Sequence, residues 1–163
     1  MLNLAEIERV TVACRRGLEL FAKAQPSLEL RYFPAGACGD ATTILGLLIE
    51  KYLGHSGTYI CGWEHPNLRE NQSHAWVLVS GILIDITHDQ FPGTAISGWV
   101  FSGGTAWHDK FARQEDHGGF SSHLQWPPYL HEAYWAADVA VAEFVTRHDM
   151  LSISGNTVPV TVV

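Results

Sequence analysis

The stretch SHAWVLVSGILIDIT, residues 73–87, contains two runs of apolar residues on either side of Ser80-Gly81. A serine-glycine pair between two such runs is typical of the two-residue turn of a β-hairpin. The stretch therefore predicts antiparallel strands over residues 74–79 and 82–87. We expect this hairpin to form the centre of the fold, with the other elements packed around it.

The register of the predicted hairpin brings two polar side chains together. With Ser80-Gly81 at the turn, His74 lies opposite Thr87, and Trp76 lies opposite Asp85. His74 and Asp85 are then diagonal neighbours on one face of the sheet, within reach of a hydrogen bond between carboxylate and imidazole. An unpaired carboxylate on this apolar strand would be costly, so Asp85 is expected to have such a partner.

Three segments around the hairpin have apolar residues at the 3.6-residue period of a helix. In the first segment these residues are Ile7, Val10, Cys14, Leu18 and Phe21. In the second they are Ile44, Leu45, Leu48 and Tyr52, with Asp40 as the expected N-cap and Gly54 as the expected left-handed C-cap. In the third, which begins at Pro127-Pro128, they are Leu130, Tyr134, Ala137, Val141, Phe144 and Val145.

The remaining segments complete an α+β arrangement, with helices first, then an antiparallel sheet, then a closing helix. Residues 58–63 predict a further strand, and residues 99–101 and 105–107 predict a second short hairpin. We expect one domain over residues 1–150. The tail, residues 151–163, is β-prone but contains a proline, which is typical of an edge strand or a disordered end.

The composition favours one acidic globular domain. The chain has 163 residues, of which 47% are hydrophobic, which is enough for one sizeable core. Its net charge is −7, so we expect neither a nucleic acid nor an anionic membrane as partner. Three cysteines in no pairing pattern indicate free thiols, and no signal peptide or membrane span is apparent. We expect a cytoplasmic protein, with secretion without a signal peptide left open.

One cysteine lies in an unusual place. Cys38 stands between two glycines in GACGD, residues 36–40, just before the apolar stripe of the second predicted helix. A helix N-terminus and a neighbouring imidazole both favour the nucleophilic thiolate. His74 can supply that imidazole, with Asp85 to orient it, which is the arrangement used for covalent acyl transfer. The other cysteines, Cys14 and Cys61, are expected to be structural.

A cysteine at a helix start, an HxW strand and a DxT strand, in this order, resemble the transglutaminase-like branch of the papain-like thiol enzymes. The matching stretches are GACGD at 36–40, HAW at 74–76 and DIT at 85–87. The resemblance covers residues 33–91 and implies a papain-like core. It also implies that Cys38 is the nucleophile, His74 the general base and acid, and Asp85 the residue that orients His74.

The family contains peptidases, glutamine-directed amidases and deamidases, transglutaminases, and bacterial toxins and effectors. The resemblance therefore implies a thiol-dependent acyl-transfer enzyme acting on a peptide or protein amide. No cofactor and no metal is expected. The number of subunits in the active protein stays open.

This sequence departs from the family at the residues around the thiol. Gly39 stands where transglutaminases usually have tryptophan, and no glutamine shortly precedes Cys38 to match the oxyanion donor of papain. These departures point away from protein cross-linking and from typical papain-like proteolysis. The oxyanion is expected at the Cys38 N–H and a second donor, with Tyr32 and Gln90 as candidates. Trp76 is expected to pack against a helix, with substrate contact as the alternative.

Two other functions stay open at this point. The first is a metal-dependent hydrolase, because the chain has nine histidines. Adjacent residues on a strand point to opposite faces, however, so an adjacent His-Asp pair on a strand would not bind one metal together. The candidate ligands are His88-Asp89, His108-Asp109, and His117 with His123. Alternatively, the tryptophans of the Gly-rich segment 88–127 form the contact surface of a non-catalytic binding domain, or roof a substrate cleft. These residues are Trp99, Trp107 and Trp126.

Overall fold

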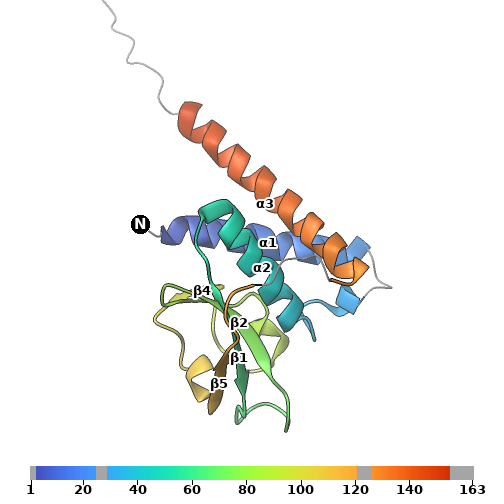
Figure 1. The fold of residues 1–163 in the computed structure, drawn as a ribbon, viewed down its shortest axis with the longest axis vertical. Helices are drawn as coiled ribbons and strands as arrows, with labels where there is room; N and C mark the ends of the chain where they lie inside the picture. The colour runs from blue at the N-terminus through green and yellow to red at the C-terminus, as the bar shows by residue number, and fades with distance from the viewer. Residues whose placement is uncertain (1–2, 25–28, 121–125, 155–163) are drawn as a thin grey trace, which may run out of the picture.

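A computed structural model describes residues 3–24, 29–120 and 126–154 of the chain (Figure 1). In this part of the chain the fold is α+β, as expected, with three α-helices and a five-stranded antiparallel sheet. The helices are α1 (Leu4–Ala24), α2 (Cys38–Leu53) and α3 (Pro128–Ser154). The strands are β1 (Thr58–Trp63), β2 (His74–Val79), β3 (Ile82–Ile84), β4 (Val100–Ser102) and β5 (Arg113–Asp116), in the order β4-β3-β2-β1-β5. Three short 3₁₀ turns are η1 (Glu29–Tyr32), η2 (His88–Gln90) and η3 (His108–Lys110).

The predicted hairpin is formed by β2 and β3 in the expected register. Val79 pairs with Ile82 across the turn, and Val77 pairs with Ile84. The turn residues Ser80 and Gly81 both have positive φ, of 49° and 82°, as a type I′ turn requires. The strand β3 is shorter than expected and ends at Ile84. The next residue, Asp85, still donates its N–H to the Trp99 carbonyl beside β4.

The two faces of the sheet are covered differently. On one face, Val77, Val79 and Ile84 pack against the helices in the main core. On the other face, side chains of the sheet pack against the segments that connect the strands, in a second cluster of Ile60, Trp76, Leu83, Phe91, Trp107 and Phe111. Trp76 therefore does not pack against a helix as expected, because strand alternation places it on the face opposite Val77.

The helix predictions hold in the main. The five apolar residues predicted for α1 are all buried. Gly54 ends α2 in the left-handed conformation with φ of 67°, as expected. Asp40 is not the N-cap, because α2 begins at Cys38 and its N-cap is Ala37. Asp40 instead lies in the first turn, where it accepts a hydrogen bond from Tyr129.

Two predictions for the second half of the chain are wrong. The segment 99–107 does not fold on itself, because β4 pairs with β3, and residues after it lead into η3. The strand β5 was not expected; it pairs with β1 at the other edge of the sheet. Residues 151–154, expected in a β-prone tail, lie in the last turn of α3, and 155–163 fall outside the described residues.

The helix α3 crosses the N-terminal helix at close range (Figure 1). Its residues Leu130, Tyr134, Ala137 and Val141 are buried, as the stripe predicts, whereas Phe144 is largely exposed. The backbones approach most closely at Gly17, where an added Cβ would lie 2.7 Å from Cα of Ala137. Among the described helices, none has the length and apolarity needed to span a membrane.

We predict that Gly17→Ala destabilises the protein. Alanine normally stabilises a helix interior relative to glycine by about 0.5–1 kcal/mol, but here the methyl group meets backbone atoms of α3 that cannot rotate away. We expect a loss of about 1–3 kcal/mol in the free energy of unfolding, measured by urea denaturation. Val12→Ala, at an exposed position of α1, is the matched control and should change stability little. A Gly17→Ala protein as stable as the parent would contradict this packing.

Candidate active site

The predicted contact between His74 and Asp85 is present in the structure. Nε2 of His74, the first residue of β2, lies 2.6 Å from Oδ2 of Asp85, just after β3. Both side chains are fully buried. Asp85 continues the pairing of β3 with β4, because its own N–H donates to the Trp99 carbonyl, and its Oδ1 accepts from the N–H and hydroxyl of Thr87. The carboxylate is therefore fixed from both sides.

A second imidazole, which the sequence analysis did not assign to this site, binds the same carboxylate oxygen. Nε2 of His108, the first residue of η3, lies 3.0 Å from Oδ2 of Asp85. Because a carboxylate only accepts, both rings donate from Nε2. Nδ1 of His108 then accepts from the Thr105 hydroxyl at 2.8 Å, which fixes its tautomer. Nδ1 of His74 has no hydrogen-bond partner among the described residues.

The electrostatics of the three groups follow from burial and mutual contact. Burial alone lowers the pKa of His74, but the charge and hydrogen bond of Asp85, with a contribution from the Cys38 thiol, raise it to about 9. Burial opposes ionisation of Asp85, yet the two imidazoles outweigh it and hold the pKa of this carboxyl below its usual range. Burial lowers the pKa of His108, because its own bond to Asp85 only partly compensates. At neutral pH His74 carries the proton and His108 is neutral.

Cys38 lies at the start of α2 and is partly exposed to solvent. Its thiol is close enough to the His74 ring to help raise the pKa of that imidazole. Because Nε2 of His74 is used by Asp85, Nδ1 is the ring atom left to face the sulfur. Among the described residues no side chain caps the N-terminus of α2, which leaves its first N–H groups without a side-chain acceptor. The structure thus brings together the three residues predicted as catalytic.

Two side chains hold the loops on which Cys38 and Asp85 depend. Gln90, in η2, accepts from the Gly36 N–H at 3.0 Å and donates to the Thr87 carbonyl at 2.9 Å. Its amide is thus engaged by backbone and links the loop before Cys38 to the chain after Asp85, in place of the expected oxyanion donation. Tyr32, the other expected donor, is 67% exposed and stacks against Arg31.

The buried Arg15 of α1 makes a second link to the same chain segments. Its guanidinium bonds the Ile86 carbonyl and both carboxylate oxygens of Asp89. It also lies between the rings of Phe33 and Trp99, at 4.8 and 4.7 Å from their centroids. Sequence reasoning missed this residue, because an arginine on a helix next to another arginine gives no sign of burial.

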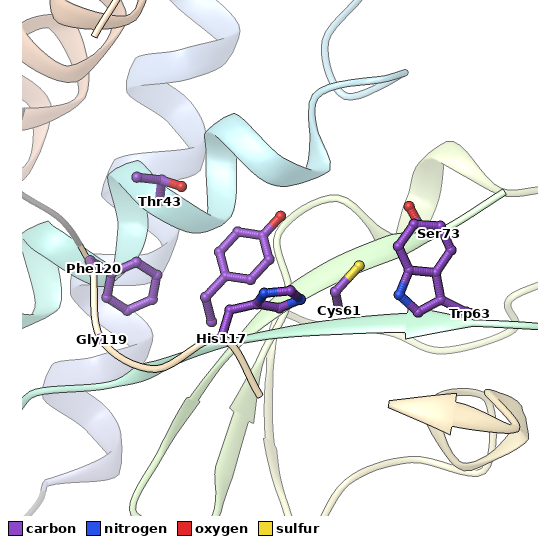
Figure 2. A pocket seen from close by; sticks show the side chains of 8 residues that line it. Thr43, Cys61, Trp63, Ser73, His117, Gly119 and Phe120 are labelled. Atoms are coloured by element: carbon purple, nitrogen blue, oxygen red, sulfur yellow. The ribbon is translucent and has the colours of Figure 1, made fainter. Parts of the chain in front are cut away.

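A pocket of about 520 Å³ adjoins the start of α2 (Figure 2). Tyr59, Cys61 and Trp63, which alternate along β1 and so share one face of the strand, line it. A Cβ on Gly39 would lie 3.2 Å from the Tyr59 hydroxyl, so this lining residue reaches the first turn of α2 next to Cys38. Cys38 itself is partly exposed to solvent, whereas Cys14 is wholly buried in the main core.

The His74–Asp85–His108 cluster also has the composition of a metal site. Its three ligand atoms all lie within 4.8 Å of one another. However, ligands about 2.0–2.1 Å from a tetrahedral metal are roughly 3.3 Å apart. The separation of 2.6 Å between His74 and Asp85 is instead that of a charge-assisted hydrogen bond. The spacing of His74 and Asp85 therefore fits a hydrogen bond between them better than two ligands of one metal ion.

The other histidines and tryptophans considered in the sequence have separate places. His88 donates to the Gly98 carbonyl, and His117 lies 3.6 Å from Glu115, while His123 falls outside the described residues. Trp107 is buried in the second cluster, and Trp99 is half-buried beneath Arg15. Neither lines the pocket beside Cys38. Comparisons of the chain with protein-family models, curated proteins and solved structures found no match.

We predict that the carboxylate of Asp85 sets the titration of His74. In a Cys38→Ala protein, NMR of the ring should give a His74 pKa above the ordinary 6.5, because the carboxylate charge remains. In Cys38→Ala/Asp85→Asn the pKa should fall below 6.5, since burial then acts without an opposing charge. An unchanged His74 pKa after removal of the carboxylate would contradict the assignment.

The same titration predicts how stability depends on pH. A raised pKa means that the folded state binds the His74 proton more tightly than the unfolded state, so the contribution is complete below about pH 6.5. This contribution is lost as the pH rises toward 9, and the free energy of unfolding falls by up to about 3 kcal/mol. Urea denaturation of Cys38→Ala at several pH values should show this loss, and Asp85→Asn in the same background should remove it.

We predict that His108 adjusts the proton affinity of His74 through the shared oxygen. His108→Leu removes one of the donors to Asp85, so the carboxylate should attract the His74 proton more strongly and raise its pKa further. His108→Gln can keep an N–H donor and should restore the parental value. NMR titration in the Cys38→Ala background measures both. A His74 pKa that does not respond to His108→Leu would argue against coupling.

Proposed function

We propose that this protein is a thiol-dependent acyl-transfer enzyme with a papain-like core, in which Cys38, His74 and Asp85 act together. The observation that carries the proposal is the short, buried contact between His74 and Asp85, which leaves Nδ1 of His74 for the thiol at the start of α2. A nucleophile, a base and a group that orients the base are the parts that covalent acyl transfer needs.

The chemistry begins with a proton on His74. In the reactive form the Cys38 proton resides on Nδ1 of His74, so that a thiolate lies beside an imidazolium, which the Asp85 carboxylate stabilises. The thiolate attacks the carbonyl carbon of an amide, ester or related acyl bond, and His74 returns the proton to the leaving group. Water or an amine then attacks the thioester, with His74 as base, and releases the thiol.

The oxyanion formed during attack needs donors near the sulfur. The N–H of Cys38, at the uncapped start of α2, is the first candidate, as the sequence suggests. The hydroxyl of Tyr59 is the second, because a Cβ on Gly39 would lie only 3.2 Å from it. Burial raises the pKa of Tyr59 to about 12, so this hydroxyl keeps its proton. Gly39, where transglutaminases have tryptophan, gives Tyr59 room to approach.

The expected substrate is a peptide or protein amide, because the resemblance to transglutaminase-like enzymes implies one. Two features support an enzyme over a non-catalytic binding domain. A binding domain needs neither a partly exposed thiol at an uncapped helix start nor, close to it, a buried imidazole oriented by a carboxylate.

We predict that 4-nitrophenyl acetate acylates the protein at Cys38. The parent should release nitrophenolate in a burst and gain one acetyl group, located by peptide mass spectrometry. Cys38→Ala should show neither, although alanine fits the same position at the helix start. His74→Gln should acylate about 10²- to 10⁴-fold more slowly, because general-base assistance is lost.

Two controls separate this reaction from its alternatives. Cys14→Ala, deep in the core, should acylate like the parent. A chelator should leave the rate unchanged, whereas a metal hydrolase would lose activity. Retained turnover in Cys38→Ala would end the proposal. Acetylation spread equally over the three cysteines would also count against it.

A further inference from the structure

The pocket beside Cys38 has a definite place relative to the sulfur. Its floor is formed by residues of β1, and Thr43, in the second turn of α2, forms one wall (Figure 2). The Thr43 hydroxyl donates back to the Gly39 carbonyl at 2.9 Å, so its methyl group faces away from that bond. A substrate bound with its carbonyl at the sulfur can therefore extend a neighbouring group into the pocket.

Four of the eight described lining residues carry rings: Tyr59, Trp63, His117 and Phe120. Tyr59 meets His117 edge to face, with centroids 5.7 Å apart, and meets Phe120 at 6.5 Å. Trp63 lies at the other end, where Arg113 covers its ring from outside. The sequence makes room for Phe120, because a Cβ on Gly46 would lie 2.1 Å from its Cε2 atom. The ring is thus seated directly on the backbone of α2.

Among the described lining residues, His117 is the only side chain that can become a cation, and its Nε2 already lies 3.6 Å from Glu115. None of the described lining residues is Asp, Glu, Lys or Arg. Burial raises the pKa of Cys61 above its ordinary value, and the Tyr59 hydroxyl is also un-ionised at neutral pH. A charged group placed here would lose hydration, and its one possible partner, His117, already lies beside Glu115, whereas a neutral ring can pack edge to face.

We propose that this pocket binds a neutral aromatic group of the substrate, next to the acyl bond that Cys38 attacks. The inference rests on the proposed function, because it takes Cys38 as the nucleophile. A volume of about 520 Å³ is in the range of small-ligand sites, so it holds one such group. The substrate class is then an amide, ester or thioester with an aryl or arylalkyl substituent close to the carbonyl.

The test uses four iodoacetamides that differ only in the group on nitrogen: 2-phenylethyl, propyl, 2-carboxyethyl and 2-aminoethyl. Alkylation of Cys38 is followed by peptide mass spectrometry, and each rate is divided by the rate with glutathione. We expect the phenylethyl reagent to react at least about tenfold faster than the other three, as a filled apolar pocket gives. Its rate should also saturate with concentration.

Two variants test the wall directly. Phe120→Ala removes a ring, and Gly46→Ala displaces the same ring from its seat. Both should reduce the ratio of phenylethyl to propyl rates toward one, with folding checked by circular dichroism. Trp135→Ala removes an equally aromatic but exposed side chain of α3 and should leave the ratio as in the parent.

The outcomes separate this inference from the proposed function. Equal rates for the four reagents, with Cys38 still reacting faster than Cys14 and Cys61, would overturn the aromatic pocket and leave the thiol chemistry standing. A preference for the aminoethyl or carboxyethyl reagent would also overturn it. Slow alkylation of Cys38 by every reagent would count against the proposed function itself, and the inference would fall with it.

Discussion

The Asp85 carboxylate, buried between two imidazoles, is the constraint on which the rest of the structure depends. An ionised carboxylate in an apolar interior is stable only if hydrogen-bond donors surround it. Here the donors come from three parts of the chain: His74 at the start of β2, Thr87 after β3, and His108 in η3. The carboxylate therefore joins the central hairpin to a segment with little regular structure of its own.

A different set of contacts positions the thiol, and these contacts also involve the chain just after Asp85. Arg15 of α1 binds the chain just after Asp85 and packs on Phe33, which precedes the loop to Cys38. Gln90 bonds that loop directly at Gly36. The helices and the sheet thus do not position sulfur and imidazole independently. A shift of the chain after Asp85 would move both partners together, which keeps their separation fixed.

Local signals in the sequence were sufficient for the hairpin and for the pairing of His74 with Asp85, because turn chemistry sets a register and the register sets neighbours. They could not reveal His108, since it reaches the site from a loop with no periodicity. Nor could they reveal β5, whose sequence RQED lacks apolar alternation and pairs at an exposed edge. The expected hairpin over 99–107 is wrong because β4 pairs with the edge of β3, a strand far from it in the sequence. The α+β class was predictable; the papain-like identity of the core remains a prediction.

The double use of one carboxylate oxygen by His74 and His108 has a consequence for how related sequences should be interpreted. The two histidines and the aspartate hold segments of the fold in place whether or not any reaction occurs. Under the proposed function, a related chain without the thiol would still gain stability from all three. The presence of these three residues in another chain would therefore indicate a shared fold. Only a cysteine at the helix start would indicate the proposed chemistry.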